Sequence, residues 1–366
     1  MGALLRRMHL DAELLFGLLI LGSFSLFVLY SAGGQETGLL AKQGIRLLSG
    51  FAVLVFLAQL SPQILRAWTP WLYGLGIVLL AVVIFHGVSA KGAQRWLDVF
   101  GLFRFQPSEL MKLALPLMLA RYFSEHQLPP TTSRLIVGAV LIGIPFGLII
   151  QQPDLGTSLL IAASGFFVIF LAGIRWRLLL GLGAAALAML PVAWYFLLRE
   201  YQKTRILTLL NDDVDPLGDG WHIIQAKIAI GSGGTYGKGW LNGTQSQLEF
   251  LPERHTDFIF AVIGEEFGLV GLILLLTVFL FVTARGLYIA AHGQDTFERL
   301  LAGSISLTFF VYVFVNMGMV SGILPVVGLP LPLISYGGTS IVTLMAGFGM
   351  IMSIHTHKKL FHHADI

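Results

Sequence analysis

The chain has 366 residues and a net charge of +3; 56% of its residues are hydrophobic and only 12% are charged. That charged share is about half of what a soluble domain usually carries, so the composition excludes an ordinary soluble protein and predicts an integral membrane protein. The basic residues are dispersed, which gives no reason to expect a nucleic-acid partner. The sequence contains no cysteine, which excludes disulfides and thiolate metal sites.

Continuous apolar runs predict the membrane-spanning helices. A hydrocarbon core roughly 30 Å thick takes about 20 apolar residues per crossing, and runs without polar alternation argue against an outer-membrane β-barrel. We therefore expect an all-α polytopic integral membrane protein with about ten transmembrane helices. In chain order the predicted spans are Glu13 to Ser31, Ile45 to Leu60, Pro70 to Phe85, Leu110 to Tyr122, Leu135 to Ile150, Leu155 to Ala172, Leu178 to Leu198, Phe258 to Val282, Leu301 to Met319 and Ile341 to Ile354.

An even number of spans places both termini on one side of the membrane. Arg6, Arg7, Lys358 and Lys359 lie close to membrane ends on that side, and the positive-inside rule makes it cytoplasmic. The first apolar run is long for a signal peptide and lacks a clear cleavage site, so we expect it to remain as an anchor.

Residues 199–256 form the longest segment without a continuous apolar run, and we expect one large loop on the outer side between the seventh and eighth helices. The chain would then be a single membrane domain, with seven spans in 1–198 and three in 257–366. Within the loop, WHIIQAKIAIGSG predicts a short amphipathic helix that ends at Gly231. The stretch GSGGTYGKGWLNGTQSQ could approach an anion, but without phosphate-loop spacing it favours a plain flexible loop.

Several ionisable residues fall inside predicted spans. Glu109 and Lys112 share one helix face, where a structural ion pair and a functional site are equally good interpretations. Asp154 stands at a helix start, which slightly favours a capping role. The adjacent acids Glu265 and Glu266 lie deep in the eighth span and are harder to explain by structure alone.

The stretch LEFLPERHTDFIFAVIGEEFG places Asp257 at the start of an apolar run, beside the charged residues Glu253 and Arg254. An acid there could simply stabilise the first turn of a helix, with Thr256 as the cap. The crowding of charge next to a large outer loop favours a functional role instead. A carboxylate at such an edge could serve as a general base.

Six strings stand out along the chain: KGAQRWLD, FQPSELMK, QQPDLGTS, HIIQAKIAIGSGG, LPERHTDFIFAVIGEE and GLPLPLISYGGTS. Together they resemble the SEDS family, and its rod-shape branch in particular, over nearly the whole chain. The resemblance implies a peptidoglycan glycosyltransferase that joins lipid II into β-1,4 glycan strands during cell elongation, at the outer face of the bacterial inner membrane. It implies a class B penicillin-binding protein as partner, Asp257 as the catalytic residue, and Glu109, Lys112 and Asp154 as further site residues.

The implied reaction releases a polyprenyl pyrophosphate, whose charge must be met by cations or by a divalent metal such as Mg²⁺ or Mn²⁺. The sequence does not identify the ligands of such a metal. A lipid II flippase or a scaffold for the transpeptidase remains as the alternative function, because intramembrane charges also mark transporters. The candidate cations for binding the pyrophosphate in the glycosyltransferase reaction are Lys91, Arg95, Arg205, Lys227, Lys238 and Arg254.

Overall fold

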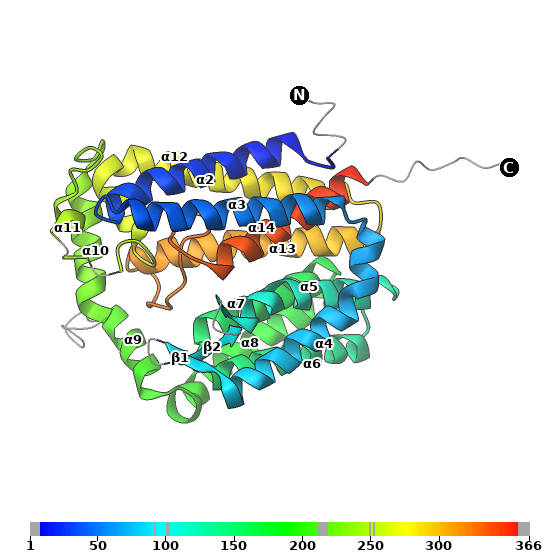
Figure 1. Cartoon of the computed structure of the whole chain (residues 1–366). Helices are drawn as coiled ribbons and strands as arrows, with labels where there is room; N and C mark the ends of the chain where they lie inside the picture. The colour runs from blue at the N-terminus through cyan, green and yellow to red at the C-terminus, as the bar shows by residue number, and fades with distance from the viewer. Residues whose placement is uncertain are drawn as a thin grey trace.

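The computed structural model describes residues 8–90, 93–99, 103–210, 219–248, 250–251 and 253–357. Figure 1 shows a bundle of long helices in which α2, α3, α12, α13 and α14 occupy one half and α4 to α8 the other, with short elements at one end. The long helices are α2 (Ala12–Ala32), α3 (Thr37–Gln59), α4 (Pro62–His86), α5 (Pro107–Ser124), α6 (Thr132–Gln151), α7 (Leu155–Leu171), α8 (Trp176–Val192), α12 (Ile259–Ala291), α13 (Thr296–Val320) and α14 (Thr339–Thr356).

Every predicted span overlaps one of these helices, the seventh continuing past α8 into a π-helical turn at Ala193–Leu197, and the all-α membrane fold is confirmed. Eight candidate spans in the described part of the chain are long and apolar enough to cross a membrane. The two exceptions are α5, which carries Glu109, Lys112 and Arg121, and α7, which has only 17 residues. The count of ten crossings therefore stays a prediction.

Three helix boundaries differ from the predicted spans by eight or more residues. Helix α3 begins at Thr37 rather than Ile45, and α4 begins at Pro62, which occupies the first helical position where its missing N–H costs nothing. Helix α12 continues to Ala291 rather than Val282. Its 33 residues correspond to about 50 Å at 1.5 Å per residue, more than the membrane core requires.

Small residues allow the helices to approach closely, as is usual where lipid supplies no hydrophobic driving force between them. A Cβ added to Gly349 of α14 would lie 2.5 Å from the backbone oxygen of Leu54 in α3. One added to Gly17 of α2 would lie 2.7 Å from Val282 of α12. The lack of a side chain at these two glycines lets α3 pack closely against α14 and α2 against α12.

The connections contain structure that the sequence analysis did not predict. A small antiparallel sheet in the order β1-β2-β3 follows α4, with Asp98 of β2 paired in register with Arg104 of β3. The predicted amphipathic helix is present as α10, although it ends at Gly233 rather than Gly231. The elements are β1 (Val88–Ala90), β2 (Ala93–Val99), β3 (Phe103–Phe105), the π-helical turn η1 (Ala193–Leu197), α9 (Glu200–Leu210), α10 (Asp219–Gly233) and α11 (Thr244–Gln247).

The two ends of the described chain meet at one end of the bundle. The rings of His9 and His357 stack with their centroids 3.9 Å apart. This contact agrees with termini on the same side of the membrane. The basic residues used for the orientation, Arg6, Arg7, Lys358 and Lys359, lie outside the described residues.

Candidate active site

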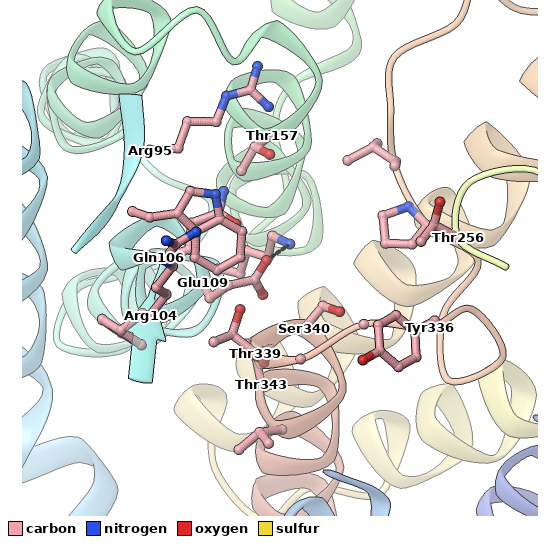
Figure 2. Close-up of a pocket in the computed structure, with 18 of the residues that line it drawn as sticks. Arg95, Arg104, Gln106, Glu109, Thr157, Thr256, Tyr336, Thr339, Ser340 and Thr343 are labelled. Atoms are coloured by element: carbon pink, nitrogen blue, oxygen red, sulfur yellow. Dashed lines mark hydrogen bonds and ion pairs between the residues drawn. The ribbon is translucent and has the colours of Figure 1, made fainter. Parts of the chain in front are cut away.

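A cavity of about 1210 Å³ opens at the bundle end opposite the chain ends, between the two halves of the bundle. It lies where α5, α7 and α14 begin, and where the chain enters α12. Figure 2 shows Arg95, Arg104 and Gln106 on one side of the cavity and Thr256 and Tyr336 on the other. The polar and charged side chains that line it are Arg46, Ser49, Arg95, Asp98, Arg104, Gln106, Glu109, Lys112, Asp154, Thr157, Thr256, Asp257, Tyr312, Tyr336, Thr339, Ser340 and Thr343.

Asp257 lies in the turn before α12. Phe258 is the N-cap of that helix, and its side chain makes no capping hydrogen bond. Thr256 is not the cap of this helix, because its hydroxyl donates to Glu253 Oε2 at 2.7 Å and Phe258 occupies the N-cap position. The interpretation that Asp257 stabilises the first turn stays a prediction. Across from the carboxylate, Gly328 adopts φ +68°, and a Cβ there would lie 3.6 Å from Asp257 Oδ2. The glycine thus keeps a side chain away from the Asp257 carboxylate, which lines the cavity.

Hydrogen bonds fasten the Asp257 turn to the segment between α13 and α14. Asn316 donates from Nδ2 to the backbone oxygens of Asp257 (3.0 Å) and Leu329 (2.6 Å). Ser335 Oγ donates to the oxygen of Thr256 at 2.6 Å. Because Asn316 and Ser335 are both buried, these bonds fix the backbone on which the carboxylate is carried.

On the opposite side of the cavity, Glu109 and Lys112 form the expected ion pair, with Nζ and Oε1 2.7 Å apart and both residues buried. Pro107 and Glu109 suit the first turn of α5, where a missing N–H and a negative charge are both tolerated. Lys112 Nζ also lies 4.9 Å from the ring centroid of Tyr312 on α13. The pair therefore joins the two halves at the floor of the cavity.

Asp154 caps α7 as expected, since its side chain accepts a hydrogen bond from the Thr157 N–H at 3.1 Å. The same carboxylate lies 3.5 Å from Arg95 Nη1 and accepts a bond from Gln106 at 3.4 Å. Capping and cavity lining are thus combined in one residue. Asp154 also holds Arg95 at the cavity edge.

Of the predicted cations, the structure places Arg95 in the cavity lining, and Lys91 lies outside the described residues. Within the described ranges, the lining does not include Arg205, Lys227, Lys238 or Arg254. The sequence analysis missed Arg46 and Arg104 as site residues. Both were visible as cations in outer segments, but only the fold brings α3 and the small sheet to the same cavity.

The remaining acids have structural partners away from the cavity. Glu265 is fully buried and accepts hydrogen bonds from Lys238 Nζ (2.8 Å) and from the backbone N–H of Gln245 (2.9 Å). Glu266 accepts a bond from Ser31 Oγ. Glu265 thus holds α11 in place, and Glu266 holds the end of α2.

The glycine-rich segment of the loop is an ordered clamp rather than a plain flexible connection. Gly268 interrupts α12 with φ 63° and ψ −163°, which breaks its regular backbone bonding. The N–H of Lys238 donates to Glu265 O at 3.0 Å, and Leu269 N–H donates to Gly234 O at 3.0 Å. The loop thereby satisfies backbone groups on both sides of the break.

The comparisons with known proteins fit this geometry. Residues 4–360 match the family model for the FtsW, RodA and SpoVE cell cycle proteins. The chain is 53% identical over 354 residues to the peptidoglycan glycosyltransferase MrdB of Escherichia coli K12, covering 97% of this chain and 95% of that one. The chain belongs to this family. MrdB of Helicobacter pylori 26695 is 38% identical over 327 residues, covering 87% of this chain and 84% of that protein.

Solved structures of the FtsW/RodA/SpoVE family share the fold. One, from work on the structural coordination of polymerization and crosslinking by a peptidoglycan synthase complex, matches with a TM-score of 0.84 and 33% identity, covering 95% of this chain and 99% of that one. The crystal structure of Thermus thermophilus RodA matches with a TM-score of 0.72 and 32% identity, covering 94% and 96%. The resemblance to the SEDS family, the other name for this group, is confirmed.

Proposed function

We propose that Asp257 is the general base of this chain, which is a peptidoglycan glycosyltransferase. The observation that carries the proposal is the placement of the Asp257 carboxylate in a large cavity that also holds several cations. Small-molecule sites usually measure about 300–1,000 Å³, so the cavity is large enough for sugar units from two substrates. The substrate in this proposal is lipid II.

The reaction needs a base because a sugar hydroxyl is a poor nucleophile. Asp257 removes the proton from the acceptor hydroxyl as its oxygen attacks the anomeric carbon of the donor sugar. The glycosidic bond forms as the bond from the anomeric carbon to the pyrophosphate breaks. Attack opposite the leaving group converts the α-linkage of the donor into a β-1,4 linkage in the glycan strand.

Positive charge stabilises the pyrophosphate as it leaves. Inversion places base and leaving group on opposite sides of the donor sugar, and the structure offers Arg95 and Arg104 across the cavity from the Asp257 turn. Lys112 lies deeper on that side but is already paired with Glu109. We assign the leaving pyrophosphate to the side that carries Arg95 and Arg104.

A divalent cation such as Mg²⁺ or Mn²⁺ is part of the proposal only together with the substrate. Mg²⁺ is often held by one or two carboxylates and by substrate phosphates. Asp98 and Asp154, which line the cavity on the side of Arg95 and Arg104, would supply such ligands together with pyrophosphate oxygens, and the metal would add positive charge near the leaving group. In the part of the chain that the structure describes, no three His, Cys, Asp or Glu side chains gather into a preformed metal site.

The proposal places the multi-pass chain in the bacterial inner membrane, with the cavity facing the periplasm and the termini in the cytoplasm. The meeting of His9 and His357 at the end away from the cavity supports this orientation. A class B penicillin-binding protein is the proposed partner, and its transpeptidase domain would crosslink the new strand. The relation to a synthase complex that combines polymerization and crosslinking supports this partner.

The test compares Asp257→Asn with the parent protein, each purified with its partner, by the glycan formed from lipid II on a gel. Loss of a general base lowers the rate by about a hundredfold to ten-thousandfold. Asp295→Asn is the control, because Asp295 caps α13 and asparagine caps nearly as well. Near-parental rates for Asp257→Asn would assign the base to another residue, and a parent that makes no polymer would favour a flippase or scaffold.

A further inference from the structure

Two pyrophosphates must be present when each glycosidic bond forms. This inference rests on the proposed function: every lipid II unit arrives with its own pyrophosphate, and only the donor loses one during the transfer. The acceptor keeps its pyrophosphate at the far end of its sugars. A cavity that joins two such units therefore needs a second place for anionic charge.

The cations of the cavity lie in two groups. Arg95, Arg104 and Lys112 belong to the small sheet and to α5, across from the Asp257 turn. Arg46, on α3, belongs to the same side as that turn, because its guanidinium carbon lies 4.1 Å from the ring centroid of Tyr336. Tyr336 in turn donates its backbone N–H to His255 O at 2.8 Å.

Two of the three cations across from the Asp257 turn have acidic partners, although Arg95 Nε is buried without a hydrogen-bond partner among the described residues. Arg95 faces Asp154 at 3.5 Å, and Lys112 faces Glu109 at 2.7 Å. Arg46 is half-buried, and its Nη1 is buried without a hydrogen-bond partner among the described residues. A guanidinium has five donors in a fork that matches phosphate oxygens, and leaving one buried and unpaired is costly.

The neighbour of Arg46 is itself electropositive. The guanidinium lies beside Gly338, since a Cβ added there would be 3.8 Å from Nε. Gly338 is the N-cap of the 18-residue helix α14 and supplies no capping side chain. The first backbone N–H groups of a helix carry partial positive charge, so Arg46 and the α14 terminus repel each other unless an anion lies between them.

We propose that Arg46, together with the start of α14, binds the pyrophosphate of the acceptor lipid II. The stereochemistry decides between the two substrates. The donor pyrophosphate must lie opposite the base, which is the side of Arg95 and Arg104. The anion held on the same side as Asp257 therefore belongs to the acceptor, whose hydroxyl Asp257 deprotonates.

The experiment separates the two substrates and measures only the first bond. Lipid II blocked at its acceptor hydroxyl serves as donor, and the acceptor is either lipid II or the same disaccharide as a simple alkyl glycoside without pyrophosphate. The full chain with its partner is compared as parent, Arg46→Gln, Arg46→Lys, Arg95→Gln and Asp257→Asn. Initial rates at varied acceptor concentration give kcat and KM, and thermal unfolding checks the fold of each variant.

With lipid II as acceptor, we expect Arg46→Gln to lower kcat/KM by about tenfold to a hundredfold, mainly through KM, as the loss of a charged hydrogen bond predicts. With the alkyl glycoside, Arg46→Gln and the parent should agree within about twofold, because the group that Arg46 binds is absent. Arg46→Lys should recover part of the loss, since it keeps the charge without the fork. Arg95→Gln should lose rate with both acceptors.

An equal loss for Arg46→Gln with both acceptors would overturn the proposal and assign Arg46 to the donor or to the fold. No loss with either acceptor would overturn it as well. The outcome is independent of the base: a fully active Asp257→Asn would refute the role of Asp257 and leave the acceptor comparison for Arg46 intact.

Discussion

The side-chain amide of Asn316 holds the backbone of Asp257, with Nδ2 donating to the Asp257 oxygen across 3.0 Å. Asn316 lies on α13 and is fully buried, so the proposed base is positioned by a residue 59 positions further along the chain. The same amide also donates to the oxygen of Leu329, the residue after Gly328. The turn before α12 and the segment before α14 are thereby fixed together.

We expect Asn316→Leu to reduce polymerisation at least about tenfold, because two buried carbonyl oxygens lose their donor at a cost of about 1–3 kcal/mol each. Thermal unfolding should show a lower Tm, while binding of the partner persists. Ser306→Ala is the control on the same helix, since its hydroxyl bonds to the Ala302 oxygen one turn away within α13. Parental turnover in a folded Asn316→Leu would show that the Asp257 turn needs no such support.

The buried pair Glu109–Lys112 gives a second prediction. Either Glu109→Gln or Lys112→Met leaves a buried charge without its partner, which typically costs about 3–5 kcal/mol, so both should lower stability and polymerisation. The double variant removes both charges and should recover the Tm. If the pair also contacts substrate, polymerisation stays low in the double variant; full recovery of both properties would make the pair purely structural.

Gly268 provides a test of the clamp on α12. We expect Gly268→Ala to destabilise the protein strongly, because φ is 63° and an added Cβ would lie 2.4 Å from the Gly237 nitrogen. The Tm in detergent measures the effect. Gly147→Ala on α6 is the matched control, since a Cβ there meets nothing within 4 Å, and alanine should be neutral or slightly stabilising. Equal Tm values for both variants would contradict the observed break.

The N-cap of α2 predicts a dependence of stability on pH. Burial by itself raises the pKa of Asp11, but hydrogen bonds from Arg285 and the Leu14 N–H, with the charges of Arg285 and His355, lower that pKa below its ordinary value. A lowered pKa in the folded state stabilises the fold above the unfolded pKa of roughly 4, and this contribution is lost as the pH falls further.

The measurement is the Tm of the purified protein as the pH is lowered from about 6 to about 3. The parent should lose more Tm over this range than Asp11→Asn, which keeps a capping side chain but cannot titrate. Glu13→Gln is the control, because its carboxylate is exposed although it also faces Arg285 at 2.9 Å. Identical pH profiles for the parent and Asp11→Asn would contradict the role assigned to Asp11.

The helical membrane fold could be predicted from the sequence because hydrophobic length is a local property. Each run of apolar residues had to form a helix to satisfy its backbone in lipid, wherever its neighbours lay. The ends of α3, α4 and α12 were less predictable, since polar turns at the membrane edge can extend a helix without changing the apolar run. The sheet after α4 was missed because strands this short carry little pattern.

For the site, the sequence by itself indicated Asp257, the Glu109–Lys112 pair and Asp154 as candidate residues, because an ionisable residue at an apolar boundary is visible in any arrangement of helices, and all four line the cavity. Only the tertiary structure decided which cations share the cavity. It brings Arg46 from α3 and Arg104 from β3 into the lining, and it directs Lys238 to Glu265 instead. Charge on a loop is a sequence property, whereas the distance between two loops depends on how the helices between them pack.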